Sequence, residues 1–468
     1  MKPDHTHHED LAPSPADGSA LMPAGHGAQT HQAMAAAPGA TMAQNHGADW
    51  AHFANMILGV WLMTSSFALA YRSRALEASD LLSGALVIVL SVLSLSPGWL
   101  WAPWANSVVG IWLLFAPLVF WAPTPASYAN DTLAGALVIA FAILVAMPGM
   151  RMIPGPDAPP GWSYNPSTWP QRAPIIALAL VGFFLSRQMA AFELHHIGSL
   201  ADPLFGRGTE EVLTSKVSLS FPIPDAGLGA VAYMIEFLMG FMGDKNRWRT
   251  MPWMVTFFGI LVVPLGIVSI TLIILQPLMV GSWCTPCLVA GLAMLIMIPL
   301  TLDEVVAMGQ FLVQARHEGQ PMWRTFWMGG TLKDVPDAGS VRPDVVRPQA
   351  MVWGMALPWN LLVSAALGVW LMIAPTVFGS TTTAAHNDDL FGALIVTVAI
   401  IAMADVSRAA RFLNVVFAAW VVAAPWLLTG ATTGAKMNDA IVGALVLLLS
   451  LRRGPVSERY GRYEKFIR

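Results

Sequence analysis

The stretch Trp283-Cys284-Thr285-Pro286-Cys287 runs directly into an apolar segment from Leu288 to Leu302. Its two cysteines are the only ones among 468 residues. At the start of a helix, cysteines at positions i and i+3 share one face and can close a small disulfide. The unpaired backbone N–H groups and the helix dipole at that position stabilise a thiolate and lower its pKa. Pro286 suits a first turn, where its missing N–H is not needed.

Two interpretations of this pair differ in chemistry. One is structural, with two small buried residues on a membrane helix. The other is a redox-active dithiol, which we favour because both cysteines of the chain stand at this one spacing. The motif also resembles a thioredoxin active site, but the alternating strands and helices of that fold are not visible around it.

The composition indicates a multi-span membrane protein. Apolar residues make up 56% of the chain and charged residues 11%, and the mean hydropathy is +0.59. The net charge of −3, with no basic, aromatic-rich surface, predicts no nucleic-acid partner. The start of the sequence lacks the pattern of a secretory signal peptide.

Twelve apolar segments predict an all-α integral membrane protein with about twelve transmembrane helices. Backbone groups cannot stay unpaired in lipid, so helices are the spanning element that this pattern allows. The segments are 51–70, 81–97, 102–121, 132–148, 174–191, 225–243, 252–276, 283–302, 353–378, 389–405, 409–429 and 438–451.

An internal repeat with a period near 50 residues occupies both ends of this series. Each copy has a tryptophan and, five residues later, a proline (Ser66 in the first copy). An aspartate comes further on, four residues before a Gly-Ala-Leu. We predict that each copy is a helical hairpin, in which the proline ends or kinks the first helix, the aspartate caps the second, and small residues allow close helix contact. The tryptophans and aspartates are Trp61 and Asp80, Trp112 and Asp131, Trp370 and Asp388, Trp420 and Asp439.

The repeat resembles the SPW repeat family, whose signature is partly present as Ser96-Pro97-Gly98-Trp99. The resemblance covers about 51–148 and 353–451, as two pairs of hairpins. It implies membrane hairpins without an established chemistry. We interpret the repeated Asn and Asp residues as helix–helix hydrogen bonds and caps, with an ion or substrate path as the alternative.

The block between the repeats has a long polar loop, 192–224, which contains Thr209-Glu210-Glu211-Val212-Leu213-Thr214-Ser215 and leads through Ile223-Pro224 into a Gly-containing helix. With the Cys-x-x-Cys at the head of its fourth helix, this block resembles the vitamin K epoxide reductase family over about 174–305. The resemblance implies a four-helix reductase-like bundle between the two repeat pairs. It also implies a thiol:quinone oxidoreductase, in which Cys287 reacts with the quinone and Cys284 exchanges with thiol donors.

One departure from the family concerns the loop. Members usually carry two loop cysteines that relay electrons to the Cys-x-x-Cys pair, whereas Thr209 stands before Val-Leu here and the loop has no cysteine. The chain also shows no fused thioredoxin-like domain. The reductant is therefore expected from outside, as a thioredoxin-like protein or a small thiol.

We expect a ubiquinone- or menaquinone-type quinone as the substrate, with no tightly bound cofactor and no metal site. Tyr233 and Ser215 are the candidate substrate-binding residues, although Tyr233 also fits an interfacial aromatic and Ser215 a cap of a short helix. Glu193, His195 and His196 stand where the fifth span ends. The histidines could handle protons or simply face water there.

Basic residues predict the orientation. With twelve spans, the groups at 245–249, 316–347, 408–411 and 452–468 share one side, which the positive-inside rule makes the cytoplasm. Both termini would be cytoplasmic and the cysteine pair would lie at the outer face, in an inner membrane of a bacterium-like cell. Arg72 and Arg74 do not fit this rule.

The predicted domains are a disordered His/Ala/Pro-rich tail (1–49), a repeat pair (50–150), a reductase-like domain (170–315), a cytoplasmic linker (316–350), a second repeat pair (351–452) and a basic tail (453–468). Two other functions stay open. The missing loop cysteines favour a non-enzymatic membrane scaffold. The six histidines of the first tail favour a metal-handling or transport protein, with the cysteines as soft ligands.

Overall fold

The computed structural model describes residues 49–69, 71–96, 98–146, 153, 155–332 and 348–467. Within these ranges the only extended pairings are three isolated bridges, Trp162–Tyr460, Asp202–Gly206 and Met355–Ala404. The His-rich segment 1–48 lies outside the described residues, so disorder and weak metal binding stay predictions for it. Pro97 and residues 333–347 of the predicted linker also lie outside the described residues.

A helix occupies each of the twelve predicted spans. In the first half these are α2 (Asp49–Ala68), α3 (Arg74–Ser94), α4 (Ala102–Val119), α5 (Pro125–Ala146), α6 (Trp169–Glu193) and α8 (Asp225–Phe241). In the second half they are α10 (Pro252–Leu275), α11 (Thr285–His317), α13 (Trp359–Phe378), α14 (Thr382–Ile401), α15 (Arg411–Leu427) and α16 (Thr433–Leu451). Short helices fill the connections: α7 (Gly208–Leu213), η2 (Ser218–Ser220), α9 (Arg247–Thr250), η3 (Gln276–Val280), α12 (Met322–Met328), η4 (Pro348–Val352), η5 (Asp405–Ala410), η6 (Gly461–Tyr463) and α17 (Glu464–Ile467).

Ten helices in the described part of the chain are long and apolar enough to cross a membrane. An eleventh span forms if Gly208–Ser220 and α8, which meet at 89°, are counted together. The remaining predicted span, α2, is a helix but is not among the ten, since His52, Asn55 and three successive hydroxyl residues at 64–66 lower its hydropathy. The chain is an all-α, multi-pass integral membrane protein.

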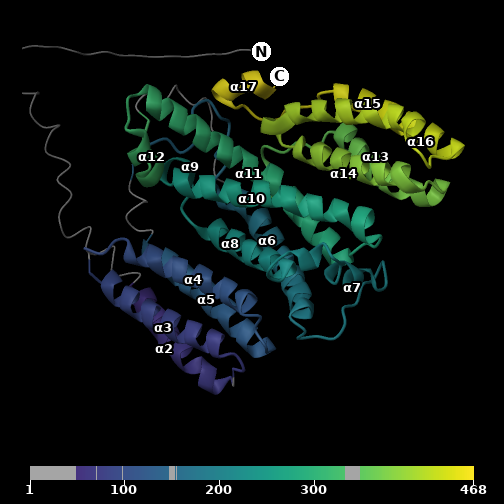
Figure 1. The fold of residues 1–468 in the computed structure, drawn as a ribbon. Helices are drawn as coiled ribbons and strands as arrows, with labels where there is room; N and C mark the ends of the chain where they lie inside the picture. Colours follow the sequence, from purple (N-terminus) through teal and green to yellow (C-terminus); the bar gives the residue numbers. More distant parts are fainter. Residues whose placement is uncertain are drawn as a thin grey trace, which may run out of the picture. The chain divides into compact units, whose positions relative to one another are not determined.

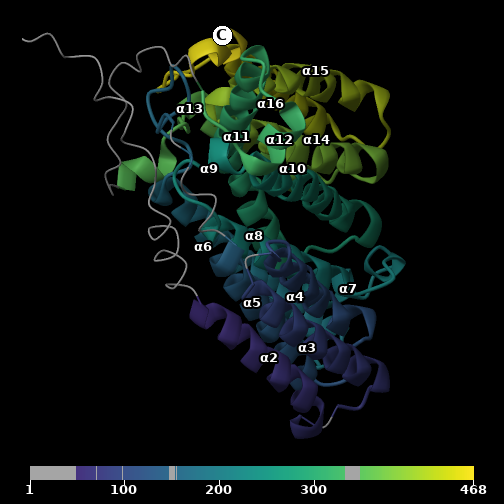
Figure 2. The same cartoon turned by 90° about the vertical axis from the view of Figure 1, so that its left-hand side faces the viewer.

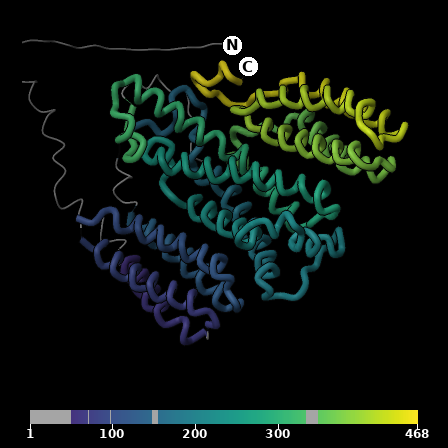
Figure 3. Tube along the Cα trace, viewed as in Figure 1, coloured from purple at the N-terminus to yellow at the C-terminus, as the bar shows by residue number. Residues whose placement is uncertain are grey.

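The helices form three groups, shown from purple to yellow along the chain in Figure 1. The first repeat pair is α2–α5, the second repeat pair is α13–α16, and the central bundle is α6, α8, α10 and α11. Within the bundle, α6 packs on α8 and α11, and α10 packs on α11. Figures 2 and 3 show the same grouping from a second side and along the Cα trace.

Each repeat pair is closed by an exchange of hydrogen bonds between its two hairpins. In the first pair, Trp61 Nε1 donates to Asn130 Oδ1 (2.7 Å) and Trp112 Nε1 donates to Ser79 Oγ (3.0 Å). In the second pair, Trp370 Nε1 donates to Asn438 Oδ1 and Trp420 Nε1 donates to Asn387 Oδ1, both at 2.8 Å. The acceptor is in every case the residue before the repeated aspartate, so the tryptophan of one hairpin is bound by its partner hairpin.

Glycines bring the two helices of each hairpin together, as predicted. A Cβ added to Gly59 would lie 2.6 Å from the carbonyl oxygen of Gly84, and one added to Gly110 would lie 2.8 Å from that of Gly135. The prolines also behave as predicted, since α4 ends two residues after Pro117.

The prediction that the repeated aspartates cap the second helices is wrong. Each stands at the seventh position of its helix and is buried. Where a side-chain cap exists it comes from an earlier hydroxyl: Leu76 N donates to Ser73 Oγ (3.4 Å), and Ala435 N donates to Thr432 Oγ1 (3.2 Å). The helices begin earlier than the apolar pattern indicates because their first turns are polar.

The helix after the cysteines continues to His317, well beyond the predicted end at residue 302. The two acidic residues that follow the apolar run, Asp303 and Glu304, are buried and paired. Tyr164 Oη donates to Asp303 Oδ2 (2.5 Å), and Arg247 donates to Glu304 through Nε and Nη2, both at 2.6 Å. Partners from distant segments therefore allow α11 to extend past the apolar run.

The predicted basic tail, 453–468, folds back on the protein. Tyr460 is fully buried, its ring edge-on to Trp162 at a centroid distance of 4.7 Å. Ser457 N donates to Asp405 Oδ2 (3.1 Å), and the other oxygen of Asp405 accepts from Arg408 (2.7 Å). The tail thus joins the second repeat pair to the end of the central bundle that lies far from the cysteines.

Candidate redox site

The two cysteines form a disulfide at the start of α11, as predicted. Cys284 is the N-cap residue, with an extended backbone, and its sulfur accepts a hydrogen bond from Cys287 N (3.2 Å). The sulfur therefore takes the place that a serine or aspartate oxygen holds in an ordinary N-cap. Both sulfurs contact Met189 Sδ of α6, which lies 3.5 Å from Cys287 Sγ and 3.9 Å from Cys284 Sγ.

Asp202, from the loop between α6 and α7, fastens this loop to the cysteine helix. Its carboxylate accepts from the Thr285 backbone N–H (3.1 Å) and from the Thr285 hydroxyl. It also accepts from Thr209 Oγ1 (2.6 Å) and from Phe205 N (2.9 Å). Thr209, which stands where the family usually has a loop cysteine, is fully buried and holds Asp202 in place.

The Asp202 carboxylate is kept charged by these donors. Burial alone disfavours the charge, but the hydrogen bonds from Thr209, Thr285 and Phe205 outweigh it and hold the pKa of Asp202 below its usual range. A negative carboxylate at the first turn of α11 also interacts favourably with the helix dipole.

Further contacts seat the loop on residues 282–285. The Ser282 hydroxyl donates to Glu211, and a Cβ on Gly208 would lie 2.1 Å from the carbonyl oxygen of Trp283. Cys284 is consequently fully buried, whereas Cys287 is partly exposed. In this conformation an external thiol has no access to Cys284, and only Cys287 faces open space.

The open space is a cavity of about 120 Å³ between α6, α8, α10, α11 and the loop. It brings together three of the four predicted site residues, Cys287, Tyr233 and Ser215, while Cys284 lies behind Cys287. About half of the other lining residues are aliphatic, and the further polar ones are Ser186, Ser218, Asp225, Ser269 and Gln276, so the chamber is mainly apolar with a polar side.

The polar groups differ in what they can still bind. Tyr233 Oη donates its proton to the backbone carbonyl of Ala290 (2.7 Å), and its ring fills the space beside Gly182. Ser215 Oγ accepts from Ser218 N (3.4 Å). This is the helix-capping interaction that was predicted as the alternative to substrate binding for Ser215. Both residues are therefore tied to the protein, and a quinone oxygen could use only their remaining hydrogen-bonding capacity.

Gln276 is a site residue that the sequence analysis missed. Its Oε1 accepts from Cys284 N (3.0 Å), which orients the amide, and the side chain lines the cavity next to Cys287. It begins the π-helical turn η3, a type of distortion that is frequent at functional sites. The available signal was that Gln276 is the one amide side chain in the apolar stretch 252–280.

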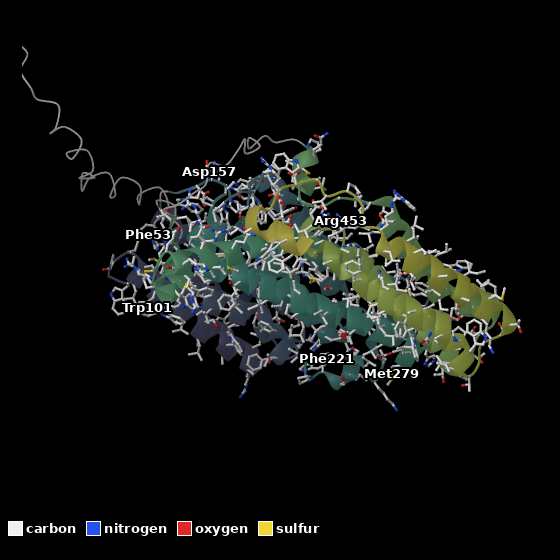
Figure 4. The ribbon with its side chains drawn as sticks, turned by 90° about the horizontal axis from the view of Figure 1, so that it is seen from above. Phe53, Trp101, Asp157, Phe221, Met279 and Arg453 are labelled. Carbon is white, nitrogen blue, oxygen red and sulfur yellow. A yellow bond between two sulfur atoms is a disulfide. The ribbon has the colours of Figure 1, made fainter. Side chains whose placement is uncertain are left out.

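Asp202 was missed as well, because a single aspartate in a polar loop has no pattern to distinguish it. Figure 4 shows Phe221 of the loop and Met279 of η3 on the lower side of the molecule and Asp157 near its upper side. Cys287 is in the first turn of α11, and Glu304 lies far along the same helix. The cysteine site and the buried Arg247–Glu304 ion pair therefore lie toward opposite ends of the bundle.

Glu193, His195 and His196 lie apart from the disulfide. Glu193 Oε2 accepts from Ala226 N (3.2 Å) at the start of α8, and Ser218 Oγ lies 3.1 Å from Glu193 Oε1. His196 Nε2 lies 2.8 Å from the carbonyl oxygen of Ala122 in the first repeat pair. These residues hold the loop and the repeat pair in place.

The described residues include no group of three or more His, Cys, Asp or Glu side chains that could hold a metal ion. The fold and the site together define a class: a multi-pass membrane protein with a thiol–disulfide pair at a helix start, facing an apolar chamber. Residues 173–302 match the model of the vitamin K epoxide reductase family, and residues 49–145 and 352–453 match that of the SPW repeat domain.

The protein thus contains a vitamin K epoxide reductase family domain flanked by SPW repeat domains, as the residue patterns predict. The family domain supports a membrane thiol–disulfide oxidoreductase role. Comparisons with curated proteins and with solved structures found no match to the chain.

Proposed function

We propose that the protein transfers electrons from an external thiol to a quinone through Cys284 and Cys287. The observation that carries this proposal is that Cys287, already paired with Cys284, lines the apolar chamber of the central bundle. Two donor thiols reduce the disulfide and become a disulfide themselves. The reduced pair then gives two electrons and two protons to the quinone, which leaves as hydroquinone while the Cys284–Cys287 bond re-forms.

In this scheme Cys287 faces the quinone and Cys284 reacts with the donor. The Cys287 N–H group, which donates to Cys284 Sγ (3.2 Å), and the helix dipole at the start of α11 stabilise a thiolate on Cys284. Gln276 Nε2 supplies a donor for a quinone oxygen, because Oε1 of the same amide is held by Cys284 N. Tyr233 and Ser215 shape the chamber and add polar contacts to the ring.

The loop must release Cys284 before a donor can reach it. We propose that Asp202, Thr209 and Thr285 form the latch of this loop, in place of the thiol relay that the family's loop cysteines provide. The lowered pKa of Asp202 means that the charged latch contributes stability above the ordinary aspartate pKa. That contribution is lost as the pH falls through the lower folded-state value.

For orientation we propose an outer location for the cysteine end and a cytoplasmic location for the other end, in a bacterial inner membrane. Arg316, Arg452 and Lys465, all exposed, support this by the positive-inside rule. Arg247 and Arg249 were counted in the same prediction, but both are buried, so they support it less. Arg247 is paired with Glu304, and Arg249 donates to the backbone carbonyls of Pro156 and Ile153.

The test is thiol-dependent reduction of a short-chain quinone by the purified protein, with dithiothreitol as donor, followed by quinone absorbance. We expect Cys287→Ser and Cys284→Ser to lose all turnover above background. Thr271→Ala, a hydroxyl deletion on an exposed face of α10, is the matched control and should retain it. Background rates in the unaltered protein would rule out the enzyme and favour a membrane scaffold.

Access to the pair is tested separately. Asp202→Asn removes the charge of the latch, and we expect dithiothreitol to reduce the disulfide about tenfold faster, since hydrogen bonds to a charged group are among the stronger ones. Asp244→Asn, in a loop at the far end, is the control. Equal reduction rates in both variants would mean that the latch does not limit access.

A further inference from the structure

A second cavity, of about 1010 Å³, lies between the central bundle and the first repeat pair. The bundle contributes α8 and α10, and the repeat pair contributes Trp104, Val108 and Ile111 of α4 with Ile139 and Ile143 of α5. Apart from Ser107 and the indole nitrogens, its lining side chains are hydrocarbon or thioether. A groove this apolar suits a hydrocarbon chain.

The groove extends along α10. On α10 its lining runs from Trp253 to Val268, which corresponds to about 22 Å at the helical rise of 1.5 Å per residue. One end is closed by aromatic rings, where Trp104 meets Trp253 edge-on at a centroid distance of 5.1 Å and Trp253 stacks on Trp327 at 6.1 Å. The other end points toward the cysteines.

At that end the groove and the chamber of Cys287 share one stripe of α10. Leu261, Leu265 and Val268 line the groove, and Leu272 lines the chamber. These positions are i, i+4, i+7 and i+11, which lie on one face of a helix. The lining of the two spaces is also continuous in sequence, since Val268 belongs to the groove and Ser269 to the chamber. The two spaces have no lining residue in common, and this stripe of α10 runs from one to the other.

The first repeat pair is firmly seated as the outer wall of the groove. Leu118 of α4 occupies the space beside Gly227 of α8, where an added Cβ would lie 2.4 Å from it. Leu114, Leu118, Ile139 and Ile143 also belong to the same buried core as α6 and α8. The wall is therefore a fixed part of the domain and not a loosely attached neighbour.

We propose that the groove holds the prenyl chain of the quinone whose ring occupies the chamber of Cys287, so that the first repeat pair forms part of the substrate site. This rests on the proposed function and specifies its substrate class as a long-chain quinone. We favour a prenyl chain as the occupant because of the length of the groove, its hydrocarbon lining and the stripe of α10 that it shares with the chamber. A phospholipid acyl chain, which would have no reason to continue toward Cys287, is the competing occupant.

The test compares a quinone without a long chain and a long-chain quinone as substrates of the full protein in nanodiscs. Val108→Trp narrows the groove from the repeat side, at a position that is 65% exposed and so tolerates a larger side chain. We expect the KM for the long-chain quinone to rise about tenfold, since several methylene groups lose their contacts, with the short-chain KM unchanged. Val60→Trp, on exposed α2 and outside the groove, is the matched control and should change neither.

A binding readout accompanies the kinetics. In Cys287→Ser protein, which cannot turn over, retention of the long-chain quinone after gel filtration should fall with Val108→Trp and not with Val60→Trp. Unchanged KM and retention in Val108→Trp, as expected for a lipid-filled groove, would overturn the inference. So would an equal loss for both quinones. Failure of the proposed function is seen separately, as absence of Cys287-dependent reduction of the short-chain quinone.

Discussion

The two repeat pairs have the same internal construction and different attachments. In both, each tryptophan donates to the residue before the partner hairpin's aspartate. The first pair merges with the reductase domain in one continuous hydrophobic core. The second pair has a core of its own, which includes Leu371, Ile395 and Val446, and it contributes only partly buried residues of α14, such as Ile400, to the surface of the shared core. Its polar end is joined to the bundle through Asp405 and the C-terminal tail.

This difference shows what the repeat specifies and what it leaves open. The repeated Trp, Gly and Asn or Ser positions determine how two hairpins close on each other. The residues that attach a pair to the bundle, such as Leu118 in one and Asp405 in the other, lie outside the repeated positions. The same unit can therefore serve as a wall of the apolar groove in one place and as a polar anchor in another.

The largest expected effect is on the polar anchor. Asp405→Ala leaves Arg408 buried without its carboxylate partner, and removal of one partner of a buried ion pair costs about 3–5 kcal/mol. We expect a correspondingly lower stability of the second repeat pair, measured by denaturant titration in mild detergent. Asp157→Ala is the control, because its ion pair with Lys245 is exposed and worth about 0–1 kcal/mol. Similar losses in both variants would show that the anchor is not what holds this pair.

An intermediate effect is expected at the apolar attachment. Gly227→Val forces Leu118 away from α8, and overpacking of this kind costs about 1–3 kcal/mol. Leu118 belongs to α4, which lines the groove. The variant should therefore also weaken the binding of a long-chain quinone. Gly198→Ala meets nothing within 4 Å and should leave stability unchanged. If Gly227→Val is neutral, the first pair is attached less closely than its shared core indicates.

The smallest effect is expected inside the pairs, and it should be equal in both. Trp61→Phe and Trp370→Phe each remove one indole hydrogen bond, and such interhelical bonds in membranes average about 0.6 kcal/mol. Double-mutant cycles with Asn130→Ala and Asn438→Ala, read by steric-trap or denaturant unfolding, isolate the coupling. Coupling energies that differ more than twofold between the two repeat pairs would contradict their having the same internal construction.

Apolar segments and repeats in the sequence predicted a helix in all twelve places, because length and hydropathy are local properties. The predictions that were wrong concern features that depend on a residue far away in the sequence. The end of the apolar run predicted the end of a span at residue 302, and α11 continues past it because Asp303 and Glu304 bind Tyr164 and Arg247. The site divides in the same way: Cys284, Cys287, Tyr233 and Ser215 follow from family-like spacing, whereas Asp202 and Gln276 act through bonds to residues that folding brings near.

The burial of Tyr460 has a consequence for the order in which the protein is made. Its ring completes a cluster begun by Trp162 and Tyr164, roughly 300 residues earlier in the chain. During synthesis, which proceeds from the N-terminus, this cluster stays open until both repeat pairs have been inserted. Completion of the packing at the end of α11 thus depends on a residue that is made after both repeat pairs. A chain released before residue 460 would carry both repeat pairs and the cysteine pair, yet would expose Trp162, Tyr164 and the nearby carboxylates to membrane quality control.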